Sequence, residues 1–247
     1  LERAKQLSQE FVQTDTQFRQ IQADTNKELI GVLGEINQFA AQVAALNQRI
    51  KEVTLSGQRP NDLYDQRQNL INKISERIEI KTLEDQFGQT TIFVGNGKAL
   101  VEGANAGSLV GVADVDKNGF LNVSFDPGNG NRVDITDAIS NGRLNSLIDV
   151  RDNLIPSYLD RLDQLSAAVI NEVNQQHRVG FGLDGSTGNN FFGPLAPSST
   201  GLNANTGNGV LSVAVADPSV LTFDQYDVTV AGGNYTITNR DTGTAST

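Results

Sequence analysis

The sequence has 247 residues, with 29 acidic and 19 basic side chains and a net charge of −10 at pH 7. This balance argues against nucleic acid or an anionic membrane surface as a partner, because both attract clustered Lys and Arg. Cys is absent and His177 is the single histidine, which excludes disulfides and thiol nucleophiles and leaves few ways to build a zinc site.

The first 55 residues predict one long helix with a heptad stripe. The stripe comprises Ala4, Leu7, Phe11, Thr14, Phe18, Ile21 and Thr25, then Leu29, Val32, Ile36, Phe39, Val43, Leu46, Ile50 and Val53. The extra step of four between Thr25 and Leu29 is a stutter, which locally unwinds a supercoil. Such a rod is too long for the core of a compact enzyme of this size. We expect part of the stripe to pack inside the chain and part of it to contact neighbouring subunits; self-association of an uncovered part near the stutter would defeat the expectation of a monomer given below.

The segment Ser56–Pro60 ends this helix, because Gly57 supplies a C-terminal turn and Pro60 blocks continuation. A second helix follows, with Asn61 or Asp62 as its N-cap and a short connection that places it antiparallel to the first. A change to a period of two then predicts an inserted antiparallel sheet. Its strongest hairpin signal is the dipeptide Asn118-Gly119.

Residues 143–178 predict a third helix, which Pro156 should kink or split. Residues 179–209 are rich in Gly, Asn, Ser and Pro and predict a loop. The pattern then returns to β with a turn at Gly232-Gly233. The three strands expected there, which make a marginal sheet, are 210–215, 226–230 and 235–238.

The expected fold class is α+β: a long-helix antiparallel bundle with inserted antiparallel β-hairpins, followed by the start of a second, all-β domain. The expected domains are a helical rod domain, residues 1–195, and a partial β domain, residues 196–247. Within the rod domain we expect helices at about 1–55, 61–79 and 143–178, and the β insert at about 80–136.

Three patterns that carry chemistry in other proteins fail their context tests here. Asp114-Val115-Asp116-Lys117-Asn118-Gly119 copies half of a calcium loop, but Phe125 stands where a bidentate Glu is required, which favours a hairpin turn. The G-x-G-x-x-G run from Gly180 to Gly185 follows a helix instead of a strand, which favours a flexible turn. No carboxylate pair in an apolar pocket is recognisable, so a glycoside hydrolase has no specific support. We therefore expect no catalytic, metal-binding or cofactor-binding residue, and no cofactor.

Three further stretches are notable for their order and spacing behind the long heptad helix. The first is Pro60-Asn61-Asp62-Leu63-Tyr64-Asp65-Gln66-Arg67, and the second is Val94–Val101, with Gly95 and Gly97. The third runs from Asn171 to Gly185 and contains Asn174, His177 and Gly180, followed by Phe191 and Phe192. Together they resemble the flagellar hook-associated protein 1 (FlgK) family. The resemblance covers residues 1 to about 195 well and the rest loosely.

The resemblance implies a structural component of the bacterial flagellum, not an enzyme, that joins hook to filament by self-assembly into a junction ring. It implies as partners copies of itself, the hook protein, hook-associated protein 3, and the flagellar export apparatus with its chaperone, but no nucleic acid and no membrane. The implied location is extracellular, reached through the export channel without a cleaved signal peptide.

The chain is expected to be a core fragment that lacks the family's terminal coiled-coil regions, and therefore to be monomeric in dilute solution. Two alternatives stay open: another flagellin-like filament or adhesin surface protein, and a hydrolase acting on glycans. The stretch from Pro60 to Arg67 favours the junction family over the first alternative, and the lack of paired carboxylates disfavours the second.

Overall fold

The computed structural model describes residues 1–247 except 203–204, 207–209, 216–221, 241 and 247. The chain forms two compact units, one of Thr16–Pro156 and the other of Leu1–Asp15 with Ser157–Thr247. The long helix α1, Glu2–Leu55, contributes residues to both. The expected domain boundary near residue 195 divides the chain at a different place and stays a prediction.

Helix α1 confirms the expected heptad rod and is buried mainly in its second half. Its buried residues are Thr25, Leu29, Val32, Leu33, Ile36, Ala40, Val43, Ala44, Leu46, Asn47 and Ile50. The stutter is not an uncovered surface, since Thr25 and Leu29 are only 8 % and 0 % exposed. Leu7 and Ile21, two other members of the stripe, are exposed. Nearer the N-terminus four members of the stripe are half-buried: Ala4, Phe11, Thr14 and Phe18.

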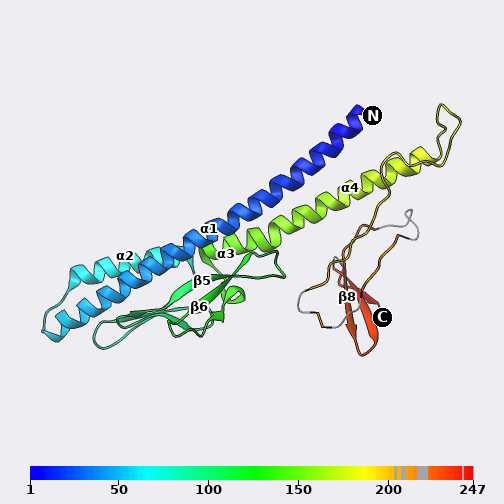
Figure 1. The fold of residues 1–247 in the computed structure, drawn as a ribbon. Helices are drawn as coiled ribbons and strands as arrows, with labels where there is room; N and C mark the ends of the chain where they lie inside the picture. Colours follow the sequence, from blue (N-terminus) through cyan, green and yellow to red (C-terminus); the bar gives the residue numbers. More distant parts are fainter. Residues whose placement is uncertain (203–204, 207–209, 216–221, 241, 247) are drawn as a thin grey trace. The chain divides into compact units, whose positions relative to one another are not determined.

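Helix α2, Asn61–Arg77, lies antiparallel to α1, as the short connection predicted (Figure 1). The expected cap at Asn61 or Asp62 was wrong. Pro60 holds the N-cap position without a side-chain hydrogen bond, and its carbonyl accepts the amides of Leu63 and Tyr64. Because the helix begins at Asn61, both polar residues lie in its first turn, where the carboxylate of Asp62 complements the positive end of the helix dipole.

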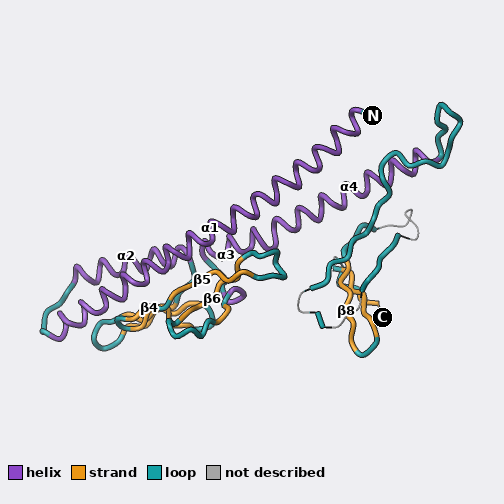
Figure 2. The backbone as a smooth tube through the Cα atoms, viewed as in Figure 1, coloured by secondary structure: helices purple, strands orange, loops and turns teal. Residues whose placement is uncertain are grey.

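The β insert forms two small antiparallel sheets, which Figure 2 colours as strands beside α1. The first has the order β1-β2-β3-β4, with bounds Lys81–Glu84, Thr90–Val94, Lys98–Glu102 and Asn105–Ala106. The second has the order β5-β6-β7, with bounds Ser108–Ala113, Leu121–Asp126 and Val133–Asp134. Asn118 and Gly119 have φ of 53° and 81° between β5 and β6, which confirms the hairpin signal.

One hydrophobic core holds α1, α2, both sheets and the next helix, α3 (Gly142–Asp149), together within Thr16–Pro156. Its members that are at most 1 % exposed include Leu29, Ile36, Ile74, Ile92, Leu100, Leu109 and Leu144. Burial of each such side chain stabilises the fold by about 1.5–3 kcal/mol relative to exposure. The helices and the β insert are therefore parts of one cooperative unit.

The third expected helix is split, as Pro156 predicted. A short 3-10 turn, Thr136–Ala138, precedes α3, and a π-helical segment, Val150–Leu154, joins α3 to α4, Ile155–Arg178. The interruption lies directly before Pro156, whose ring lacks an N–H and crowds the carbonyl four residues earlier. The amide of Ile155 instead bonds the carbonyl of Val150 five residues back.

The C-terminal sheet belongs to the other unit and has the order β10-β9-β8. Strands β8, Tyr226–Ala231, and β9, Asn234–Asn239, confirm two predicted strands and their Gly232-Gly233 turn. Strand β10 is Ala245–Ser246. The strand expected at 210–215 was wrong: this segment is irregular, because no described strand pairs with it. The loop predicted at 179–209 is confirmed where it is described, and 203–204 and 207–209 lie outside the described residues.

Candidate functional site

Residues 114–120 form a structural turn. The carboxylate of Asp114 accepts hydrogen bonds from the amide of Asp116 at 2.9 Å and from Asn122 Nδ2 at 3.1 Å. The ammonium of Lys117 donates to Asn122 and lies 3.6 Å from Asp152. Among the described residues no group of three or more His, Asp or Glu is placed to hold a metal ion. The absence of calcium binding stays a prediction.

The first family stretch, Pro60 to Arg67, ends on a buried arginine. Arg67 is 4 % exposed and donates to Asn47 Oδ1 at 3.0 Å, to the carbonyl of Gly88, and to Glu84 Oε2 at 3.0 Å. Burial lowers the pKa of its guanidinium, and the neighbouring carboxylate of Glu84 opposes that shift. Arg67 thus ties α2 to α1 and to the β1–β2 hairpin.

The other residues of this stretch shape the turn around Arg67. Its guanidinium lies 5.2 Å from the Tyr64 ring centroid, and the Tyr64 hydroxyl stands 2.5 Å from where a Cβ at Gly88 would be. Gly88 has φ of 76°, so both its conformation and its neighbour require glycine. Pro60 and Leu63 are half-buried, whereas the exposed side chains of the stretch are Asn61, Asp62, Asp65 and Gln66.

The second family stretch forms the β2–β3 turn. Gly95 and Gly97 have φ of 29° and 79°, and the amide of Lys98 bonds the carbonyl of Gly95 at 3.0 Å. A Cβ at Gly95 would stand 3.1 Å from Ile135 in the core. The glycines therefore allow a tight turn to pack against residues that precede α3.

The third family stretch folds the loop after α4 back onto that helix. Asn174 is 2 % exposed, and its Oδ1 accepts the amides of Phe191 and Phe192 at 2.9 and 2.8 Å. Its Nδ2 donates to the carbonyl of Phe192 at 3.1 Å. One amide side chain therefore satisfies three backbone groups of a segment that lies 17 and 18 residues farther along the chain.

His177 and the two phenylalanines complete this anchor. His177 Nδ1 lies 2.8 Å from the carbonyl of Asn189, and its ring centroid is 5.5 Å from that of Phe191. The Phe191 and Phe192 rings meet edge to face at 5.0 Å. Gly180 begins the loop with its amide on the carbonyl of His177, and Gly185 has φ of 79° at the tip. The predicted position of His177 in the last turn of a helix is confirmed.

Sequence reasoning missed three asparagines on α1 that bind the β insert. Asn26 Oδ1 accepts the amide of Leu121 at 3.0 Å, and Asn37 bonds both the amide and the carbonyl of Leu109 at 2.7 and 2.8 Å. Asn47 accepts the amide of Thr90 and donates to the carbonyls of Thr90 and Gly103. Their spacings of 11 and 10 residues, close to three helical turns, place them along one side of α1, but such a spacing does not distinguish them from the other polar residues of this helix.

Arg151 in the π-helical segment was also missed. It is 0 % exposed and donates to Asn26 Oδ1 at 2.7 Å, to the carbonyl of Leu121 at 2.8 Å, and to both oxygens of Asp152. A buried guanidinium needs such a complete set of acceptors, because an unpaired charge in the interior is strongly unfavourable. Through these hydrogen bonds Arg151 fixes the π-helical segment against α1 and β6.

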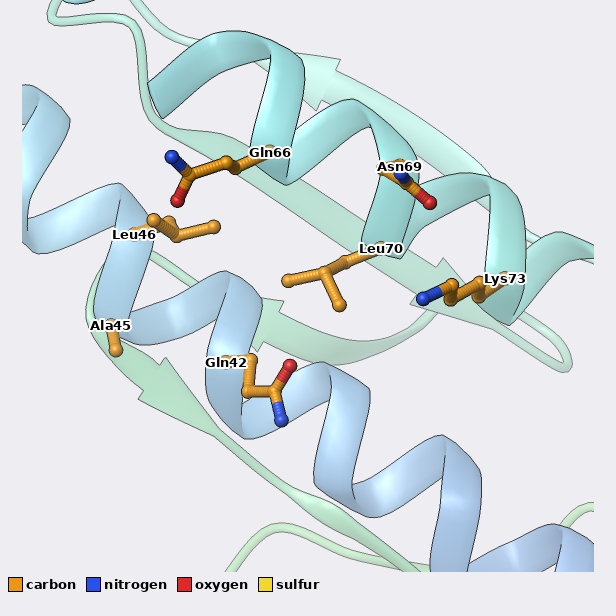
Figure 3. Close-up of a pocket in the computed structure, with 7 residues that line it drawn as sticks. All are labelled: Gln42, Ala45, Leu46, Gln66, Asn69, Leu70 and Lys73. Atoms are coloured by element: carbon orange, nitrogen blue, oxygen red, sulfur yellow. The ribbon is translucent and has the colours of Figure 1, made fainter. Parts of the chain in front are cut away.

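A shallow groove of about 430 Å³ lies between α1 and α2 (Figure 3). Figure 3 shows Leu46 and Leu70 pointing into the space between the helices. Ala45 also lines the groove, together with four polar residues: Gln42, Gln66, Asn69 and Lys73. We call this surface the α1–α2 groove. Its side-chain amides and single cation provide no catalytic pair.

Helix α1 is, among the described residues, the helix long enough and apolar enough to match a membrane span by length and composition. However, 44 % of its most apolar stretch is buried inside the protein. A helix that supplies a protein's own core meets the same criterion, so this match alone does not assign α1 to a membrane.

Comparison with known proteins identifies, for most of the chain, the family that the sequence resembles. The family model described as "Flagellar hook-associated protein FlgK helical domain" matches residues 1–192. Flagellar hook-associated protein 1 of Escherichia coli (strain K12) is 26 % identical over 244 residues, and that of Bacillus subtilis (strain 168) is 28 % identical over 195 residues. These alignments cover 98 % and 70 % of this chain, but only 45 % and 38 % of the relatives.

A solved structure, the flagellar hook junction protein FlgK from Burkholderia pseudomallei, is also similar. It aligns with a TM-score of 0.79 and 26 % identity, over 98 % of this chain and 44 % of that one. The match bears out the α+β fold expected from the sequence. The chain therefore spans less than half the length of the relatives and the structure that it matches.

Proposed function

The chain belongs to the family of the flagellar hook-associated protein FlgK helical domain, and we propose on that premise that its whole protein joins hook to filament by self-assembly into a junction ring. The observation that carries the proposal is the family match over residues 1–192. The likeness to a hook junction protein, with 98 % of the chain aligned, supports it independently.

The partners that we propose are copies of the same protein, the hook protein, hook-associated protein 3, and the export apparatus with its chaperone. The proposed location is the extracellular flagellum, reached through the export channel without a cleaved signal peptide.

A scaffold role also agrees with how this chain uses its polar side chains. The buried polar side chains described above, Asn47, Arg67, Arg151 and Asn174, all bind backbone or side-chain groups of the chain itself. Catalysis instead requires polar groups held ready for a substrate in a pocket. We therefore propose that the protein is not an enzyme.

The segment 196–247 is proposed to begin a larger β domain. Residues on one face of the β8–β9 hairpin pair across the strands, Val228 with Ile237 and Val230 with Tyr235. Both pairs are exposed, at 37 % or more for every member. Since the relatives are about twice as long as this chain, further strands of the whole protein are the proposed cover for this face.

The proposal is tested by locating the protein on intact flagella. Val115, 71 % exposed, is changed to Cys in the full-length gene, which is expressed in a flagellated bacterium deleted for its own hook-associated protein 1. A thiol-reactive dye should mark one spot between hook and filament, because the introduced Cys is the only thiol within these 247 residues, and any Cys in the rest of the full-length protein is first changed to Ser. Ala44→Cys, at a position 3 % exposed, is the control that should stay unlabelled. Dye along the whole filament would favour the flagellin-like alternative instead.

A further inference from the structure

The loop after α4 is an ordered hairpin. Phe181 and Thr187 form a β-bridge, and the amide of Gly182 bonds the carbonyl of Ser186 at 2.7 Å. Asp184 Oδ1 accepts the amide and the hydroxyl of Ser186 at 3.0 and 2.7 Å. The polar groups of the tip therefore bind within the tip, and the loop has a defined shape.

The base of this hairpin is held on α4. The hydroxyl of Thr187 bonds the carbonyls of Arg178 and Gly180 at 3.2 and 2.9 Å, and the amide of Gly188 bonds the carbonyl of Arg178 at 3.1 Å. Beyond it, Asn174 holds residues 191 and 192. Both strands of the hairpin are thus fixed to one helix end, so little conformational entropy is left to lose on binding.

This ordered loop presents apolar side chains to solvent. Phe181 is 81 % exposed, and Leu183 is fully exposed. We call Phe181, Leu183 and Asp184 the knob. A preorganised loop with adjacent exposed Phe and Leu side chains has the character of a binding surface, because clustered exposed apolar residues mark interaction sites.

The α1–α2 groove complements the knob in chemistry. Its apolar lining, Leu70 with the nearly buried Leu46, is of the same kind as the two apolar side chains, and its volume is about 430 Å³. Lys73 in the groove matches the carboxylate of Asp184. Hydrogen bonds from the hydroxyl and amide of Ser186 hold the pKa of Asp184 below its ordinary value, so this carboxylate is charged at neutral pH.

We propose that the knob of one copy inserts into the α1–α2 groove of a neighbouring copy, with Asp184 facing Lys73. The contact joins two different surfaces of the same chain, and such a heterologous contact generates a ring when its rotation closes. The proposal rests on the proposed function, because it supplies a contact for self-assembly. A small contact of this kind is weak in isolation and acts when many copies are brought together.

Cysteine cross-linking tests this contact, because the chain has no Cys of its own. Leu183→Cys protein is mixed at high concentration with Gln66→Cys protein, whose thiol lies in the groove, or with Asn72→Cys protein, whose thiol lies on an exposed part of α2. Circular dichroism verifies that each variant is folded. The groove pair should form the mixed disulfide at least about tenfold faster than the control pair, because docking raises the effective concentration of the thiols.

Two second-site changes test the details. Phe181→Ser in the Leu183→Cys protein should abolish the tenfold rate advantage of the Gln66→Cys partner over the Asn72→Cys partner. If Asp184 pairs with Lys73, added salt should reduce the rate advantage of the groove pair over the control pair. Asp184→Asn keeps an oxygen for Ser186 but removes the charge, so this effect of salt should disappear. Equal rates for the groove and control pairs would overturn the proposal. If those rates are equal while the dye of the localisation experiment still marks the junction, the knob contact fails and the proposed function stands.

Discussion

Replacing Asn47 with Ala removes a side chain that connects α1 to two other parts of the fold. Asn47 is 0 % exposed and makes four hydrogen bonds: to the amide and carbonyl of Thr90, to the carbonyl of Gly103, and from Arg67. Ala cannot replace any of them. Thr90 is itself buried, so water reaches its freed groups only if the structure opens.

The expected loss follows from these four bonds. Three of them contribute about 0.5–1.5 kcal/mol each and the one from the guanidinium about 1.5–3 kcal/mol, so Asn47→Ala should destabilise the unit Thr16–Pro156 by about 3–7 kcal/mol. Asn37→Ala loses only the two bonds to Leu109 and should cost about 1–3 kcal/mol. Gln48→Ala loses one exposed contact with Glu52 and should change stability by less than about 0.5 kcal/mol.

Urea unfolding and hydrogen exchange measure these differences. The free energy of opening is read at the amides of Ile78 and Ile135, which bond the carbonyls of Ile74 and Val123 and lose no hydrogen bond in these variants. Both lie within Thr16–Pro156, so unfolding of the other unit does not enter. The order of destabilisation should be Asn47, then Asn37, then Gln48. A loss below about 1 kcal/mol for Asn47→Ala would refute the reasoning, because it would mean that the freed backbone groups find other partners without cost.

Asn174→Ala should speed proteolysis within residues 180–192 several-fold while leaving exchange at Thr90 unchanged, since Asn174 holds only that loop. Asp134→Asn should flatten the acid dependence of stability. Burial by itself raises the pKa of Asp134, but the hydrogen bonds from Thr136 and Asn122 together outweigh it and hold this pKa below its ordinary value. A carboxyl with a lowered pKa stabilises the fold at neutral pH, and that contribution is lost as the pH falls below about 4, so acid titration of both proteins checks the sign. Calorimetry should detect no micromolar calcium binding, and heat that disappears in Asp116→Ala would contradict this. Light scattering at low micromolar concentration should show a monomer, and a dimer that dissociates in Phe18→Glu would place an interface on the N-terminal part of α1.

The parts of this fold that depend on periodicity could be predicted from the sequence. The heptads of α1, the helix stop at Gly57 and Pro60, and the turn at Asn118-Gly119 each depend on residues that are close in sequence. The strand expected at 210–215 was wrong because a strand also depends on residues that are far away in sequence. Its pattern is suitable, but a strand exists only when another strand pairs with it, and a local pattern contains no information about that partner.

The polar contacts were the part that sequence patterns could not supply. Asn26, Asn37 and Asn47 look like ordinary polar residues beside a heptad stripe, and each is recognised only when a backbone 43 to 95 residues away comes into contact. One of these asparagines is linked to a family stretch, because Arg67, at the end of the first stretch, donates a hydrogen bond to Asn47.

Asn174, in the third stretch, likewise binds backbone that is distant in sequence, because it accepts hydrogen bonds from the loop after α4. Arg67 and Asn174 each hold the backbone of a loop against a helix. Substitution of either residue should therefore loosen the loop that it holds. The groove lies between the helices that Arg67 helps to hold, and the knob lies on the loop that Asn174 holds. If the knob contact is real, Asn174→Ala should slow the Leu183–Gln66 cross-link without any change at either thiol, whereas Gln68→Ala, a change on the exposed face of α2, should not.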